Sequence, residues 1–136
     1  MNPQKAIYYK LANASAVTAF VGTKIYQVGE VPQGTAAPYI MIQKISDVPY
    51  STKDSNSLFN ARIQVNCYGE NHNSNNDLAV AVMDALDRST GGNVNGIEIV
   101  QIDFLNEVNM NEYFAAFEGL NHMAQDYAVV YLRGDS

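Results

Sequence analysis

Residues 59–88 carry the clearest pattern of apolar and polar positions in the chain. Apolar and polar side chains alternate over residues 59–67, and one face of this segment consists of Phe59, Ala61, Ile63, Val65 and Cys67. The opposite face consists of Asn60, Arg62, Gln64 and Asn66. A period of two is typical of a half-buried β-strand. The pattern therefore predicts a strand whose apolar face another element has to cover.

The residues after this strand predict a turn followed by an amphipathic helix. Residues 70–76 are polar and rich in asparagine, and we interpret them as a turn in which Ser74 caps the next helix. Over residues 78–88 the apolar positions recur at helical spacing, and their shared face consists of Leu78, Val82, Ala85 and Leu86. The polar side of this helix carries Asp77, which faces the helix dipole, together with Asp84 and Arg88. We expect the apolar face of the helix to cover the strand.

The N-terminal residues predict a bent helix. Asn2 followed by Pro3 is typical of a helix cap and first helical position. Apolar residues then recur at helical spacing as far as Leu11, residues 13–15 interrupt the pattern, and a second short helical stretch ends at Gly22. We expect this bent helix to pack on the sheet.

Four other segments have the composition and periodicity of strands, and they are residues 24–28, 39–48, 97–108 and 123–133. The apolar run that opens residues 39–48 predicts a central strand covered on both faces at its start. In residues 97–108, alternation places Val100, Ile102 and Phe104 on one face. Gln101 and Asp103 lie on the opposite face.

The segments between these elements read as connections. Residues 30–38, 49–57 and 89–96 are rich in proline, glycine or small polar residues and predict loops. Two interpretations of residues 109–121 stay open, a helical turn or a loop packed by its aromatic side chains.

The resulting order is helix, three strands, helix, two strands. This order predicts an α+β fold with a mostly antiparallel β-sheet, packed by an N-terminal helix and one central amphipathic helix. A length of 136 residues predicts a single domain over residues 1–136. The core is expected to contain Leu78, Val82, Leu86, Ile63, Val65 and Phe104.

The charge balance argues against direct nucleic-acid binding. The formal net charge is −6, and the eight Lys and Arg residues are scattered singly along the chain. A nucleic-acid binder needs a basic face to neutralise phosphates. An acidic protein past which DNA moves without sticking is compatible with this balance. We find neither a long apolar run nor a secretory leader, and we expect synthesis in a reducing cytoplasm without membrane contact.

No candidate residue forms a recognisable chemical site. Cys67, the single cysteine, lies on the apolar strand face and is expected to be an inert buried thiol. Gly91, Gly92 and Gly96 follow a helix instead of opening one, which excludes a phosphate-binding loop. His72 and His122 have no nearby metal-ligand set, and we expect a turn residue and a hydrogen-bonding edge residue. We therefore expect a protein that is not an enzyme, with no catalytic, cofactor or metal residue.

The order of the segments resembles a family of tail terminator, or tail-completion (tail-to-head joining), proteins of long-tailed bacteriophages. The segments that carry the resemblance are GTKIYQ (22–27), PQG (32–34), PYIMIQKIS (38–46), ARIQVNCYG (61–69), ALD (85–87) and DYAVVYL (126–132). The likeness covers nearly the whole chain in the same order.

The resemblance implies a structural virion protein at the head–tail junction, assembled in the host cytoplasm. Such proteins form a ring, usually a hexamer, that caps the tail tube and then meets the head connector. The partners implied are further copies of the chain, the tail tube protein and the head connector or neck protein, with DNA passing through the channel without specific binding. Two other interpretations stay open, a head-side connector or neck protein and a non-viral small-ligand binding domain.

The polar loop over residues 49–57 is the candidate docking element. It contains little apolar bulk besides Tyr50, so its own packing cannot hold it in one conformation. Either it docks on a partner, with Tyr50 as anchor, or it is a solvated hairpin tip without a partner. The candidate docking residues are Tyr50, Ser51, Thr52, Lys53, Asp54, Ser55 and Asn56.

Overall fold

The computed structural model describes residues 3–36, 38–49, 58–87, 90–94, 97–109 and 121–132. The helices are α1 (Pro3–Ala12), α2 (Ser15–Val21) and α3 (His72–Leu86). The strands are β1 (Ile25–Gln27), β2 (Tyr39–Pro49), β3 (Leu58–Gly69), β4 (Thr90–Val94), β5 (Ile97–Asn109) and β6 (Asn121–Leu132). The candidate docking residues 50–56 lie outside the described residues.

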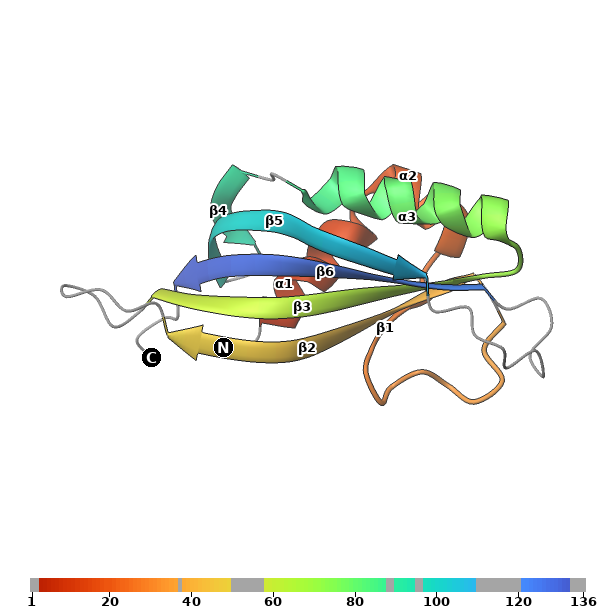
Figure 1. Ribbon diagram of the computed structural model, residues 1–136, viewed down its shortest axis with the longest axis horizontal. Coiled ribbons are helices and arrows are strands. Elements are labelled where there is room, and N and C mark those ends of the chain that lie inside the picture. The colour runs from red at the N-terminus through yellow and green to blue at the C-terminus, as the bar shows by residue number, and fades with distance from the viewer. Residues whose placement is uncertain are drawn as a thin grey trace.

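The strands form a six-stranded sheet in the order β1-β2-β3-β6-β5-β4, and the helices lie on one side of it (Figure 1). Every neighbouring pair is antiparallel except β1 and β2, which run parallel. Helix α3 packs across the central strands β3 and β6, and α1 packs on β1 and β2. The predicted α+β class with a mostly antiparallel, helix-packed sheet is confirmed.

The core lies between the helices and the covered face of the sheet. Ala61, Ile63, Val65 and Cys67 on β3 are fully buried, which confirms the predicted alternation of this strand. The core positions predicted on α3 are buried as well, and they are Leu78, Val82 and Leu86. Phe104 is half-buried and packs against this core.

The predicted bend in the N-terminal helix divides it into two helices. The interruption lies between Ala12 and Ser15, where Ala14 has an extended backbone. Helix α2 ends at Gly22, as predicted, with φ of 63°. Glycine adopts this left-handed conformation at little steric cost.

Helix α3 begins earlier than predicted. The sequence pattern places residues 70–76 in a turn capped by Ser74, whereas the helix starts at His72 and the cap is Asn71. Asn71 has an extended backbone, and its Oδ1 accepts a hydrogen bond from the Ser74 amide at 2.9 Å. Asparagine is as good a cap as serine. Asp77 consequently lies beyond the first turn of the helix.

Two predictions about residues 89–108, which lie near the β4 edge of the sheet, are wrong. Residues 89–96 were expected to form only a loop, but Thr90–Val94 forms β4, which pairs with β5 through backbone hydrogen bonds that need no apolar pattern. Val100 was expected on the apolar face, yet it is 46% exposed. A β-bulge between Ile99 and Gln101 makes Val100 an extra residue that interrupts the alternation. The side chain of Ile99 is buried in the core instead.

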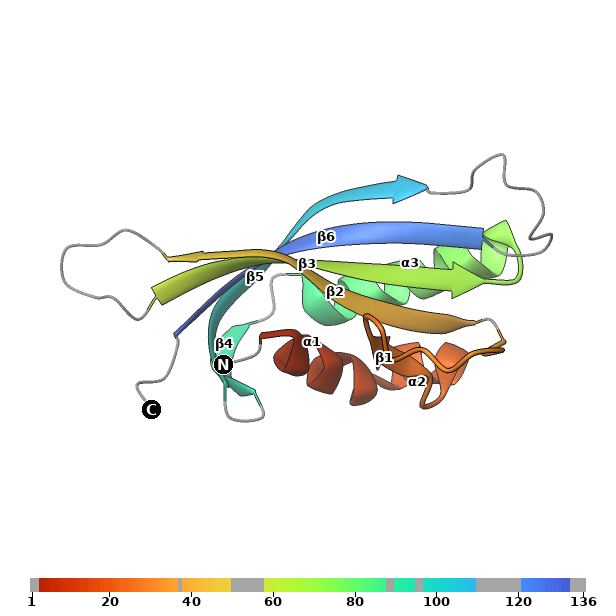
Figure 2. The same cartoon turned by 90° about the horizontal axis from the view of Figure 1, so that it is seen from below.

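The start of β2 is also not covered on both faces. Ile40 and Ile42 are buried against the helices, whereas Tyr39 and Met41 point to the opposite face and are half-buried. No described helix lies on that opposite face, which Figure 2 views with α3 behind the strands. The prediction that helices cover both faces here is therefore wrong. The apolar run continues onto the second face because Tyr39 stacks there on Tyr68.

Candidate functional site

Cys67, the single cysteine, is not placed to act as a nucleophile. Cys67 is fully buried, and burial, with a smaller contribution from the negative charge of Glu107, raises the pKa of its thiol to about 12. A thiol with that pKa does not act as a nucleophile near neutral pH. Across the described part of the chain, no three His, Cys, Asp or Glu side chains gather as a metal site. None of the described helices is long and apolar enough to span a membrane.

The candidate functional site is the uncovered face of the sheet, and its first feature is an aromatic row at one end. Tyr26, Tyr39, Tyr68 and His122 come from four adjacent strands, β1, β2, β3 and β6. The Tyr39 and Tyr68 rings stack with centroids 4.7 Å apart, and Tyr68 stacks on His122 at 4.2 Å. Tyr26 meets the edge of Tyr39 at 6.5 Å.

The row exists because the strand register puts these residues side by side. Tyr39 pairs with Tyr68, and Tyr68 pairs with His122, across neighbouring strands. Such cross-strand aromatic pairs stabilise a sheet by roughly 0.2–1 kcal/mol each. Partial burial raises the pKa of Tyr39 and of Tyr68, and it lowers the pKa of His122.

His122 is fixed by a polar contact beneath the row. Its Nε2 lies 2.8 Å from Oδ1 of Asn66. The Asn66 side chain is 2% exposed, and its Nδ2 donates to the Met41 carbonyl at 3.3 Å. The residue predicted as an edge histidine thus lies on β6, an inner strand, and its hydrogen bonding is confirmed.

A charged cluster forms the second feature of the uncovered face. The Arg62 guanidinium donates to Oδ2 of Asp126 from Nη2 at 2.6 Å and from Nε at 3.1 Å. Gln64 donates to the other Asp126 oxygen at 3.1 Å. Asp126 thereby neutralises the positive charge of Arg62 within this cluster. The cluster therefore offers polar contacts in which the guanidinium charge is already paired.

A surface hollow of about 410 Å³ lies at the β1 edge of the sheet, between α1 and β1. It is lined by Lys5, Tyr8, Ile25, Tyr26, Gln27 and Glu30. Tyr8 is 40% exposed, whereas Ile25 belongs to the core. The hollow joins the aromatic row through Tyr26 at the edge of the sheet.

The structure brings together residues that the sequence pattern did not single out. The predicted loop residues lie outside the described part, so their docking role stays a prediction. The aromatic row was missed because Tyr39, Tyr68 and His122 are far apart in sequence. Their common signal is a position at a strand end, and only the strand register shows that these ends meet.

Comparisons with known proteins identify the family. The sequence profile described as Tail completion protein gp17 matches residues 5–132. A search of curated proteins gave no match.

Two solved structures have a similar fold. One, titled "Virion of native gene transfer agent (GTA) particle", has a TM-score of 0.76 at 20% identity over 95% of this chain and 93% of that chain. A second, whose title names no function, has a TM-score of 0.58 at 10% identity over 98% and 97% of the two chains. These likenesses establish the fold, and the profile match over most of the chain establishes that the protein belongs to the tail completion protein gp17 family.

Proposed function

We propose that the protein is a tail terminator, which caps the tail tube of a phage-like particle and joins the tail to the head. The observation that carries the proposal is the family match over residues 5–132. Membership of a tail completion family favours a structural role over a catalytic one. The buried, high-pKa thiol and the hydrogen-bonded polar groups of the uncovered face agree with a protein that works by assembly.

The working form in this proposal is a ring of copies of the chain, with six as the expected number. DNA passes through the central channel. The net charge of −6 per chain disfavours phosphate contact. The uncovered sheet face is the surface we assign to the channel, because Asp126 neutralises the Arg62 guanidinium there.

The test is to assemble particles without the protein and to examine them by electron microscopy. A tail terminator predicts tails of uncontrolled length together with filled heads that carry no tail. A head-side connector or neck protein predicts tails of normal length and heads that lose their DNA. Normal tail length without the protein would contradict the proposed role. Rings of the purified protein in negative stain would test the ring directly.

We further propose that residues 50–56 dock on a tail or head protein. The β2–β3 pairing continues to Pro49 and Phe59, so the strands already hold the two ends of this segment together. Deleting residues 52–56 should therefore leave the protein folded and soluble, while particles carrying the deletion have unjoined tails. Infectious particles from this deletion would show instead that the loop has no partner.

A further inference from the structure

The two lateral edges of the sheet are only half covered by their outer strands. At one edge, β1 pairs with Ile40, Met41 and Ile42 of β2 and with none of the later β2 residues. At the other, β4 pairs with β5 only from Ile97 to Gln101. In the described chain, no strand lies outside the second half of β5, and Phe104 uses its amide to bind the Asp87 carboxylate at 2.9 Å. Residues 105–108 of β5 therefore have no described strand beside them on their outer edge.

This stretch of β5 is apolar and acidic. Leu105 is the extra residue of a β-bulge between Phe104 and Asn106, and it is 45% exposed. Val108 is also 45% exposed. A bulge re-aims a side chain, and exposed aliphatic residues on an unpaired edge mark a surface that tends to pair with another chain. Glu107 lies between these two residues in the sequence and is exposed, and its Oε1 accepts a hydrogen bond from Nε2 of Gln125 at 3.4 Å.

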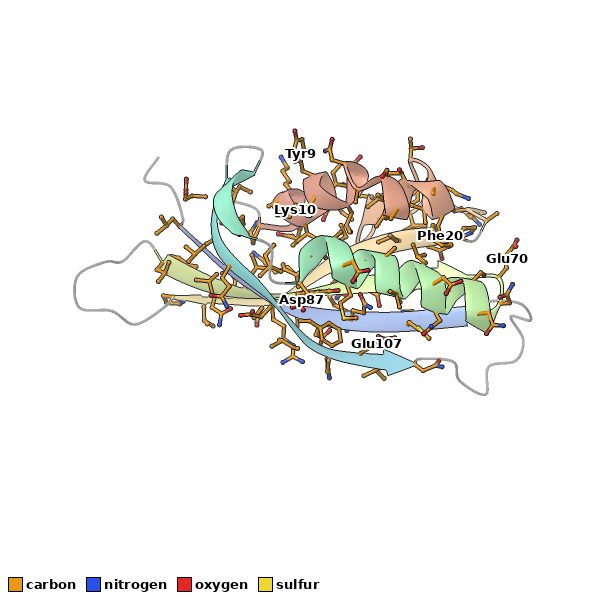
Figure 3. All side chains as sticks on the ribbon, turned by 90° about the horizontal axis from the view of Figure 1, so that it is seen from above. Tyr9, Lys10, Phe20, Glu70, Asp87 and Glu107 are labelled. Carbon is orange, nitrogen blue, oxygen red and sulfur yellow. The ribbon has the colours of Figure 1, made fainter. Side chains whose placement is uncertain are left out.

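The β1 edge offers a matching surface on the opposite side of the molecule. Figure 3 shows Tyr9 and Lys10 of α1 at one side and Glu107 of β5 at the other. The hollow between α1 and β1 has an aromatic wall formed by Tyr8 and Tyr26, with Lys5 beside it. On β2, a second bulge leaves Ile45 exposed at 47%, just beyond the end of β1.

The two edges carry opposite charges. Residues 90–109, which form β4 and β5, contain Glu98, Asp103 and Glu107 and no Lys or Arg. The four lysines of residues 3–49 are Lys5, Lys10, Lys24 and Lys44. They outnumber the acidic residues of the same stretch, Glu30 and Asp47. Lys44 is paired with Asp47, and Glu30 lines the hollow together with Lys5, so the excess positive charge of this segment is carried by Lys5, Lys10 and Lys24. An acidic β5 edge and this excess of lysines on the opposite segment favour contact between unlike edges of two copies.

The strand register places the contact residues at the same height on the two edges. Tyr26 pairs with Met41, which pairs with Asn66. Asn66 pairs with Ala124, which pairs with Val108. Val108 therefore lies level with Tyr26 across the sheet, and Leu105 lies near the level of Ile45 by the same pairings. A second copy placed alongside in the same orientation would bring Val108 to the hollow.

We propose that the β5 edge of one copy, residues 105–108, docks against the β1 edge of the next copy, with Val108 in the hollow and Glu107 near Lys5. The occupant of the hollow is a second copy of this chain, and this assignment rests on the ring proposed above. Strand β5 of one copy runs antiparallel to β1 of the next, which continues the alternation of the sheet. Because unlike edges meet, the contact is head to tail and can be repeated until a ring closes.

Two single variants test the contact, one on each edge. Tyr8→Glu places a charge in the hollow, and Val108→Glu places one on the β5 edge. Both side chains are about half exposed, at 40% and 45%, so each variant should keep the wild-type melting temperature. The matched control is Val80→Glu on α3, at 44% exposure and away from both edges. We expect each edge variant to sediment as a monomer where the wild type and the control are assembled.

Mixing the two variants separates a head-to-tail contact from any other arrangement. Each variant keeps one intact edge, so an equal mixture should form dimers and nothing larger, because the remaining edges of the dimer are both disabled. Edge variants that assemble like the wild type would overturn the edge assignment and leave the ring proposal standing. Monomeric variants that form no dimer on mixing would also overturn it. A wild-type chain that stays monomeric at every concentration would remove the ring and the edge contact together.

The charge pair gives an independent test. Lys5→Glu alone and Glu107→Lys alone should each weaken assembly by about tenfold or more at low salt, because each puts like charges together. The double variant carries the pair in reverse order at every contact and should recover assembly. A double variant that assembles no better than the single variants would contradict the pairing of these edges.

Discussion

The covered and uncovered faces of the sheet differ in how their polar groups are used. On the covered face, Gln125 is fully buried, donates to the Ala79 carbonyl of α3 at 2.9 Å and accepts from the Tyr127 hydroxyl at 2.8 Å. Asn75 of α3 donates to the Cys67 carbonyl at 3.0 Å. These bonds join the helix to the sheet inside an apolar core, where an unpaired polar group would cost about 1–3 kcal/mol.

On the uncovered face, polar groups bind one another and leave an accessible surface. Arg62, Gln64 and Asp126 form a cluster between strands, and Tyr39, Tyr68 and His122 stack in a row. No helix among the described elements packs on this side. The covered face therefore contributes more to stability, whereas the uncovered face can be substituted at smaller cost to the fold.

The largest expected effect comes from truncating the covered face. Ile63→Ala should lower the free energy of unfolding by about 2–4 kcal/mol, because Ile63 is fully buried beneath the helices. Arg62→Ala, one residue away on the other face, is the matched control and should cost at most about 1 kcal/mol, since its ion pair is partly exposed. Urea unfolding measures both. An equal loss of unfolding free energy in the two variants would contradict the proposal that the covered face contributes more to stability than the uncovered face.

The next effect tests how closely α3 meets the sheet. A Cβ at Gly69 would lie 2.6 Å from Cβ of Asn75, so Gly69→Ala should destabilise the protein by about 1–3 kcal/mol through overpacking. The clash requires the added Cβ at residue 69 and the side chain of Asn75, and Asn75→Gly removes the second of these. Gly69→Ala should therefore cost less in an Asn75→Gly background, as measured by a double-mutant cycle. An unchanged cost in that background would mean that the close approach is not the cause.

The sequence predicts the covered face better than the uncovered one. Burial against helices imposes a periodic apolar pattern, and this pattern located Ile63, Val65, Leu78, Val82 and Leu86 in the core. Where a bulge shifts the period, as at Val100, alternation assigns the wrong face. Strand β4 pairs with β5 through its backbone at the sheet edge, and such pairing needs no apolar pattern. The composition of this segment therefore predicts a loop although it forms a strand.

The uncovered face depends on contacts between strands that are distant in sequence. His122 contacts Tyr68 and Asn66 only because β6 inserts between β3 and β5. Asp87, which directly follows α3, accepts a hydrogen bond from the Phe104 amide of β5. Strand order and register decide such contacts, and neither follows from local periodicity.

A smaller effect should appear in the pH dependence of stability through His122. Burial lowers its pKa in the folded protein from the ordinary value of 6.5, so the folded state disfavours the protonated ring. As the pH falls below 6.5, the unfolded chain takes up a proton that the folded chain does not, and stability declines until the folded pKa is reached. Above 6.5 this loss is absent.

The measurement is the difference between the wild type and His122→Gln in urea unfolding across this pH range. Glutamine keeps a hydrogen-bonding group near Asn66 and does not titrate, so its stability should fall less on acidification. Identical pH profiles for the two proteins would show that His122 is not desolvated in the row.

The smallest effect on stability is expected from Asp126, and its consequence concerns DNA. The wild type should not retard duplex DNA at about 150 mM salt, because a ring of six copies would carry roughly −36, six times the −6 of one chain. Asp126→Asn removes the carboxylate that neutralises Arg62, at a cost of no more than about 1 kcal/mol in stability.

The freed guanidinium should then give weak DNA retardation that appears only at low salt, about 20 mM, where phosphate contacts are poorly screened. Adding Arg62→Gln to Asp126→Asn removes the cation and should abolish that retardation, which assigns the effect to Arg62 and separates it from the change in net charge. A wild-type protein that binds DNA tightly and in a salt-dependent manner would contradict the neutralised, non-adhesive surface. Retardation that survives in the double variant would show that another group contacts the phosphates, and the uncovered face would then lose its assignment to the channel.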